Sequence, residues 1–262
     1  MDKSTATAPR RADQYNDPEH NYLKYWQGRD YENQAEIMAI KRLLDGQKFC
    51  HAADIGGGYG RLCILLLNYA RRVSLVEPSQ QQLDIAREFL EGYKEIDRLL
   101  MQADDLKFKD GSIDLVTMIR VMHHLPDPAP EFAEIQRVLS DDGVAIIEVA
   151  NYMHGVNRLK HKLKGQPMPK QPVDIRSRIN RREDEIPFVN HNPYTVIKQL
   201  EKADLHVERI LSVSNLRSQG LKKVMPKNMM LAVEGILQPK LAKSFFGPSI
   251  FFLVKQAQKS TS

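Results

Sequence analysis

The sequence has few of the features that mark secreted, membrane-spanning or metal-stabilised proteins. It has only two cysteines in 262 residues, Cys50 and Cys63. Both fall inside apolar stretches and lack the spacing of a metal site, so we expect two reduced core residues. The longest unbroken apolar run, residues 62–67, is far shorter than the roughly 20 residues that a membrane-spanning helix needs. We therefore expect no transmembrane span and no bound metal.

A secretion signal is also missing. Arg10 and Arg11 are followed by polar residues and not by an apolar stretch, which argues against a secretory or twin-arginine signal. With reduced cysteines, this predicts a cytoplasmic protein. The chain has no internal repeat or low-complexity tract, and its 42% hydrophobic and 27% charged residues are ordinary for a globular domain. The sequence predicts one folded α/β domain.

The net charge of +5 lies in one segment. Residues 151–190 contain nine Lys or Arg against four Asp or Glu, whereas the rest of the chain has 29 of each. The basic balance is therefore a property of this segment and not of the whole domain. It predicts a solvated loop, a lid, or a patch that holds an acidic partner.

Short apolar runs alternate with helical patterns from residue 49 onward. We expect strands at 49–55, 72–77, 98–102, 113–119 and 144–150, and helices at 60–70, 80–91 and 129–139. Ser79 followed by Gln82 is typical of the start of a helix. This order predicts a parallel sheet covered on both faces.

The flanking regions differ from this alternating core. Residues 1–20 are polar and predict a flexible tail. Tyr22, Tyr25 and Trp26 follow, either as a lid over the site or packed on the sheet, and a helix is expected at 31–44. Four prolines in 151–190 exclude one long helix and leave a short one near 156–164. After it we expect a helix at 194–202, a strand at 206–213, a helix at 221–242 and a last strand at 249–254.

A glycine-rich stretch, Ala53–Arg61, lies directly after the first predicted strand and before a predicted helix. Glycines there allow a sharp turn and close approach to a ligand. The spacing is G-x-G-x-G, and Arg61 stands where the dinucleotide fingerprint has its last glycine. The Asp54 carboxylate would repel a pyrophosphate and attract a ligand with ammonium and sulfonium groups.

The second anchor is Glu77, which ends the second predicted strand. An acid at this place in doubly wound folds can accept both hydroxyls of a ribose. It follows the glycine loop at a suitable distance, 23 residues after Asp54. The two features together predict a site for a nucleoside.

Four segments of residues 50–150 resemble the class I S-adenosylmethionine-dependent methyltransferases. The resemblance is to the small-molecule branch related to the ubiquinone and menaquinone C-methyltransferases. The segments are the acidic glycine-rich stretch 54–60, Val76–Ser79 with its ribose-binding acid, Asp104–Val116 leading into the fourth strand, and Arg120–Pro128 after it. Beyond residue 150 the motifs stop.

The resemblance implies a Rossmann-like, doubly wound α/β fold. Its sheet would be mostly parallel and seven-stranded, with an antiparallel last strand and an insertion after the fifth strand. The cofactor would be S-adenosyl-L-methionine and the product S-adenosyl-L-homocysteine. The cofactor-binding residues that it implies are Asp54, Gly56, Gly57, Gly58, Glu77, Pro78, Gln102, Ala103 and Arg120. The family usually has an Asp where Gln102 stands; the glutamine oxygen, or Asp104, could accept the adenine amino group.

Other side chains allow two interpretations. Arg120 either bonds the carboxylate of the cofactor or caps the sheet. His123 and His124 either act as a general base or pack in their loop, and they have no partners at metal spacing. Methyl transfer from a sulfonium depends mainly on alignment and exclusion of water, so no catalytic residue follows from the shared core.

The sequence thus predicts an enzyme that methylates a small or lipid-like acceptor. Residues 21–150 would bind the cofactor, 151–190 would form a basic insertion or lid, and 191–262 would complete the same domain. The alternatives are an RNA or protein methyltransferase that uses 151–190, or a non-catalytic binding module. Nucleic acid is the less favoured partner because an Asn-Pro-Pro-Tyr motif and an RNA-binding domain are lacking. Nothing in the pattern selects an oligomeric state.

Overall fold

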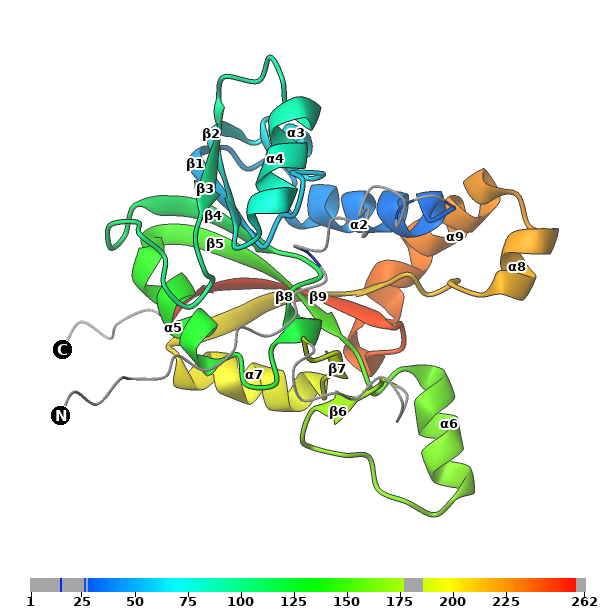
Figure 1. Cartoon of the computed structure of the whole chain (residues 1–262). Helices are drawn as coiled ribbons and strands as arrows, with labels where there is room; N and C mark the ends of the chain where they lie inside the picture. Colours follow the sequence, from blue (N-terminus) through cyan, green and yellow to red (C-terminus); the bar gives the residue numbers. More distant parts are fainter. Residues whose placement is uncertain (1–14, 16–25, 27, 177–185, 258–262) are drawn as a thin grey trace, which may run out of the picture.

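The computed structural model describes residues 15, 26, 28–176 and 186–257, and its centre is a seven-stranded sheet (Figure 1). The strands lie in the order β3-β2-β1-β4-β5-β9-β8. They are β1 (Phe49–Ile55), β2 (Ala70–Glu77), β3 (Ile96–Leu100), β4 (Ile113–Met118), β5 (Leu139–Ala150), β8 (Leu205–Val213) and β9 (Ser249–Gln256). The first five are parallel, and β9 runs antiparallel to both β5 and β8. The expected fold class is confirmed.

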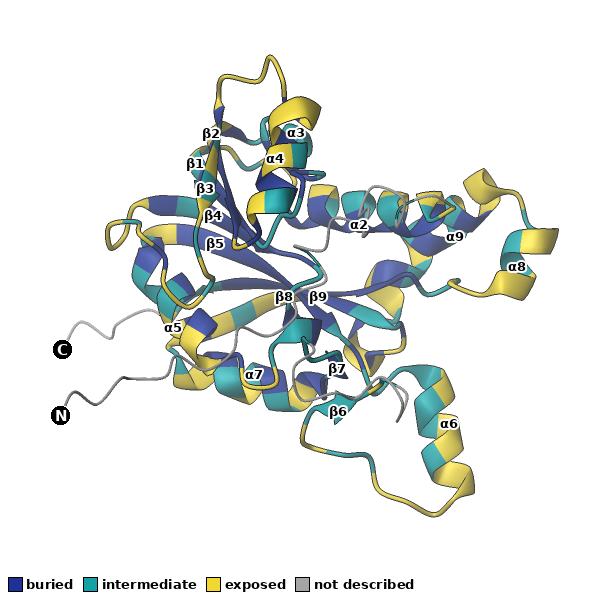
Figure 2. Cartoon of the chain, viewed as in Figure 1, coloured by how far each residue is buried: buried dark blue, intermediate teal, exposed yellow. Residues whose placement is uncertain are grey.

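Helices cover both faces of this sheet. One layer has α2 (Asp30–Leu43), α3 (Cys63–Leu66), α4 (Gln80–Phe89) and α9 (Lys227–Lys240), and the other has α5 (Ala129–Val138) and α7 (Pro193–Lys202). Neighbouring strand residues such as Ala52 and Ala53 enter opposite hydrophobic clusters. The strands are therefore buried on both faces, which is why they read as short apolar runs (Figure 2).

Two predicted helices differ from those observed. The helix expected at 60–70 is only α3, because Gly60 has φ of +85° and residues 68 and 69 bond three residues back, to Leu65 and Leu66. The helix expected at 221–242 is divided into α8 (Gln219–Val224) and α9. Pro226 causes the division, since Met225 before it is held in an extended conformation.

The cysteines also differ from the prediction. Cys63 is buried as expected, whereas Cys50 is exposed, and neither forms a disulfide. Cys50 lies at the start of β1, where only the last four residues of the strand are buried. The prediction of two core cysteines is therefore wrong for Cys50, because burial begins only further along the strand.

The insertion after β5 has more structure than the sequence indicates. It contains α6 (Gly155–Leu163), close to the short helix expected, and an unexpected pair of short antiparallel strands, β6 (Val173–Asp174) and β7 (Val189–Asn190). Figure 1 shows α6 standing out from the body of the molecule.

Some predictions concern residues outside the described ranges. These are the predictions for Tyr22, Tyr25, most of residues 1–20 and the basic residues between 177 and 185. No helix in the described part combines the length and apolar character of a membrane span.

Candidate functional site

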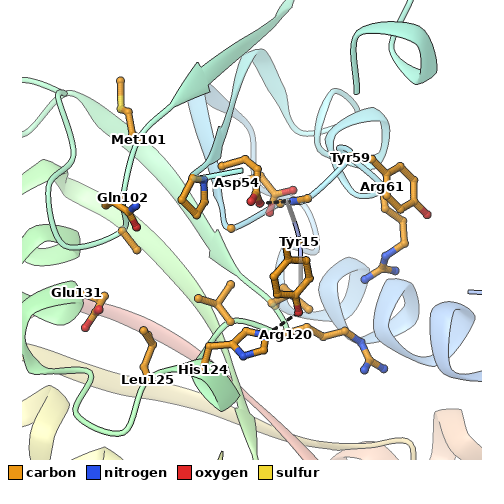
Figure 3. A pocket seen from close by; sticks show the side chains of 18 of the residues that line it. Tyr15, Asp54, Tyr59, Arg61, Met101, Gln102, Arg120, His124, Leu125 and Glu131 are labelled. Carbon is orange, nitrogen blue, oxygen red and sulfur yellow. Dashed lines mark hydrogen bonds between the residues drawn. The ribbon is translucent and has the colours of Figure 1, made fainter. Parts of the chain in front are cut away.

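A cavity of about 960 Å³ lies at the carboxyl ends of β1 to β4, next to the point where the strand order reverses (Figure 3). This is the usual place for a ligand in such sheets, and the volume suits a small molecule. The nine residues that the sequence assigns to cofactor binding all line it. They are Asp54, Gly56, Gly57, Gly58, Glu77, Pro78, Gln102, Ala103 and Arg120.

The glycine loop forms a wall of backbone on one side of the cavity. Gly56 and Gly58 have φ of +64° and +60°, a region that side chains rarely allow. A Cβ at Gly56 would also lie 2.4 Å from Val121, and one at Gly57 would lie 2.6 Å from the Asp54 carboxylate. Packing within the chain therefore excludes side chains here and leaves backbone against the cavity.

Asp54 is almost completely buried beneath this loop. Its side chain is 1% exposed, and it accepts hydrogen bonds from the Thr117 hydroxyl at 2.6 Å and from the Cys63 thiol at 3.7 Å. Burial raises the pKa of Asp54 to about 6. A cation placed beside this carboxylate would favour its charged form, so the site fits a positively charged ligand.

Glu77 ends β2 and is held by the backbone of both neighbouring loops. One carboxylate oxygen accepts from the N–H of Gly58 at 2.9 Å, and the other accepts from the N–H of Ser79 at 3.0 Å. Ser79 also caps α4, because its hydroxyl accepts from the N–H of Gln82. A carboxylate has about four lone-pair sites, and these two backbone bonds fix the orientation of Glu77 at the end of β2.

The far end of the cavity has a polar group that the sequence did not indicate. Glu131 lines the cavity together with Gln102, Ala103 and Asp104. It is 7% exposed, burial raises its pKa, and among the described residues its Oε2 has no hydrogen-bond partner. From the sequence, Glu131 looks like an acid in the first turn of a helix, so no local signal could have placed it here.

Two arginines beside the glycine loop share one buried carboxylate. Glu36 of α2 is 1% exposed and lies 2.7 Å from the Arg61 guanidinium and 2.6 Å from that of Arg120. Both guanidinium groups also lie against the Trp26 ring. Arg120 thus joins the end of β4 to α2, and Trp26 lines the cavity.

The two neighbouring histidines lie in different surroundings, one in the core and the other at the cavity. His123 is buried against Phe188, and burial lowers its pKa. His124 lines the cavity, with Nδ1 at 3.0 Å from the Pro187 carbonyl and Nε2 at 2.6 Å from the Tyr15 hydroxyl (Figure 3). A carbonyl can only accept, so Nδ1 carries a proton, and in the neutral ring Nε2 is the basic atom. No group of side chains in the described ranges has the arrangement of a metal site.

Tyr15 and Ile186 also line the cavity, and the sequence reasoning did not single out either residue. Tyr15 lies in a stretch without periodicity, 109 residues from His124, and Ile186 lies near the end of the basic insertion. The last residues of the insertion therefore reach the cavity, although α6 stands away from it. In the sequence, the only signal that could have indicated a role for Tyr15 is that it is an aromatic residue in a polar segment.

Known methyltransferases match mainly the central part of the chain. Residues 53–147 match the family model described as "Methyltransferase domain". The chain is 26% identical over 176 residues to a ubiquinone biosynthesis O-methyltransferase of Thiobacillus denitrificans, covering 61% of this chain and 75% of that protein. It is 29% identical over 112 residues to the uncharacterized methyltransferase YcgJ of Bacillus subtilis, covering 42% of this chain and 40% of that one.

Solved structures share the fold at low sequence identity. One is the protein bound to the Trm112 methyltransferase activator in a complex from Haloferax volcanii. It has a TM-score of 0.60 and 16% identity, over 90% of this chain and 93% of that one. The fold and the family match together confirm the resemblance that the four sequence segments predict.

Proposed function

We propose that this S-adenosylmethionine-dependent methyltransferase transfers a methyl group to a small or lipid-like acceptor bound in the cavity at the carboxyl ends of β1 to β4. The observation that carries the proposal is that nucleoside-binding chemistry and apolar side chains meet in this one cavity. Glu77 and the glycine loop lie on one side, and Tyr15, Leu125 and Ile186 also line it.

The residues present fit the donor. S-Adenosylmethionine would supply a methyl group activated on a sulfonium. We assign the ribose hydroxyls to Glu77, the adenine end to Gln102, Ala103 and Glu131, and the cationic end to the neighbourhood of Asp54. The work of these residues is to fix the donor in line with an acceptor and to exclude water.

The charges around the cavity favour a small acceptor over RNA. The guanidinium groups of Arg61 and Arg120 are both paired with Glu36, so one of the two positive charges is offset and both side chains are held within the protein. A nucleic-acid site depends on cations that replace the counterions of phosphates. Paired arginines are poorly suited to that, whereas the apolar lining suits an acceptor with an apolar body.

We assign the role of general base to His124, for an acceptor that loses a proton. The Pro187 carbonyl fixes the proton on Nδ1 and leaves Nε2 toward the cavity. An oxygen or carbon acid needs such a base, whereas an amine acceptor often does not. The Tyr15 hydroxyl, which bonds Nε2, occupies the position that we assign to an acceptor hydroxyl.

Transfer of labelled methyl groups tests this proposal. The chain is incubated with methyl-labelled S-adenosylmethionine and separate fractions of a cell extract: small molecules and lipids, RNA, and protein. We expect label in the small-molecule and lipid fraction, and none with Glu77→Ala, which removes the proposed ribose anchor. Label in RNA or protein, dependent on Glu77, would replace the proposal by the corresponding alternative.

A further inference from the structure

Helix α6 turns its apolar side away from the protein. Val156, Leu159 and Leu163 are 59%, 58% and 79% exposed, and their spacing of three and four residues places them on one face. No residue of α6 is buried (Figure 2). Surface helices normally bury such a stripe against the core, so this orientation is the reverse of the usual one.

The polar side of α6 holds the helix in this orientation. The Arg158 guanidinium donates to the carbonyls of Met153, Ser244 and Phe245, and the N–H of Gly155 donates to the Phe246 carbonyl at 3.0 Å. A Cβ at residue 155 would lie 2.6 Å from the Phe246 ring, so the glycine allows close packing there. These contacts fix which face of the helix points outward.

Positive charge surrounds the exposed stripe. Residues 149–173 contain five basic residues and no Asp or Glu. Among them, Lys160, Lys162 and Lys164 lie on or directly after α6 and are exposed. Aliphatic side chains flanked by lysines complement a surface that is anionic outside and apolar beneath.

We propose that α6 is a docking surface for an anionic lipid bilayer. Leu159 and Leu163 would enter the apolar boundary while the lysines contact the headgroups. RNA offers no apolar layer for the leucines, and a second copy of the same face would place like charges against one another. This inference rests on α6 alone and does not depend on the identity of the methyl acceptor.

The expected binding is reversible. A helix of nine residues with three exposed aliphatic side chains provides far less apolar area than an anchor that spans the bilayer, so charge and apolar contact are both needed. Each lysine removed should weaken binding roughly fivefold at low ionic strength. Added salt should weaken it further by screening.

Co-sedimentation with vesicles tests the proposal. The full chain is mixed with vesicles of phosphatidylcholine and phosphatidylglycerol in equal parts, or of phosphatidylcholine alone. Two variants change α6: Leu159→Ser with Leu163→Ser, and Lys160→Gln with Lys162→Gln and Lys164→Gln. Two matched controls change exposed residues elsewhere: Val224→Ser with Ile236→Ser, and Lys198→Gln with Lys202→Gln and Lys240→Gln.

We expect the parent chain and both controls to bind the anionic vesicles and not the neutral ones, and both α6 variants to lose most of this binding. The changed side chains are exposed, so the temperature of unfolding should be unchanged in every variant. Absence of binding to anionic vesicles would overturn the proposal, as would binding that survives both α6 changes. Binding of single-stranded RNA in place of vesicles, or a dimer lost in the leucine variant, would also overturn it and assign the surface to that partner.

Discussion

At the scale of single residues, Glu77 and Gln102 offer the sharpest comparison. We expect Glu77→Ala to weaken binding of S-adenosylhomocysteine by about tenfold more than Gln102→Ala does. A carboxylate makes charge-assisted bonds to two hydroxyls, and these are roughly twice as strong as the neutral bond from a glutamine oxygen. Glu77→Ala also leaves the N–H groups of Gly58 and Ser79 without their partner.

Calorimetric titration of the two variants measures the difference. Thermal unfolding without ligand serves as the control, because it reveals how far the loop itself is destabilised. Equal losses of affinity would mean that the ribose or the adenine contact has been assigned to the wrong residue.

Asp54 predicts a dependence of stability on pH. Because burial raises its pKa from 3.8 to about 6, the folded protein holds a proton that the unfolded chain releases between these values. The free energy of unfolding should therefore fall as pH rises from about 4 to about 6, by up to about 3 kcal/mol from this group. Asp54→Asn should remove this contribution, as urea denaturation at several pH values would show. An identical pH dependence in the variant would refute the assignment.

At the scale of secondary-structure elements, Glu36 joins α2 to the loops after β1 and β4 through Arg61 and Arg120. We expect Glu36→Ala to lower the free energy of unfolding by about 3 kcal/mol, because two largely buried guanidinium groups lose their anion. Asp97→Ala is the matched control. Its partner Arg72 lies in an exposed pair, so the loss should stay below about 1 kcal/mol. Chemical denaturation giving equal losses would contradict the role of Glu36.

Most elements could be predicted because their signals are local. The glycine turn after β1, the Ser79 cap of α4 and the alternation of apolar runs each lie within a few residues of sequence. The length of α3 could not be predicted, since the apolar run 62–67 continues beyond Leu66, the last residue of the helix, and contains no signal for its end. The position of α6 was close to the prediction, but which of its faces points outward depends on carbonyls near residue 245.

At the scale of the whole molecule, the cavity combines groups that are far apart in the chain. The Asp54 and Glu77 side chains were predicted because each lies at the carboxyl end of a strand in a recognisable pattern. Tyr15 with His124, and Glu36 with Arg120, meet only when the chain folds, since the partners are 109 and 84 positions apart in the sequence. No pattern of spacing records such contacts, so the lining residues at the strand ends were predictable and the contacts of Tyr15 and Glu36 were not.

The central claim is that this cavity binds the nucleoside of a methyl donor and not a dinucleotide. Calorimetric titration of the full chain with S-adenosylhomocysteine and with NAD tests it most directly. We predict tighter binding of S-adenosylhomocysteine, because the Asp54 carboxylate favours its ammonium group and disfavours a pyrophosphate, and loss of that binding in Glu77→Ala. Tighter binding of NAD than of S-adenosylhomocysteine would contradict the account.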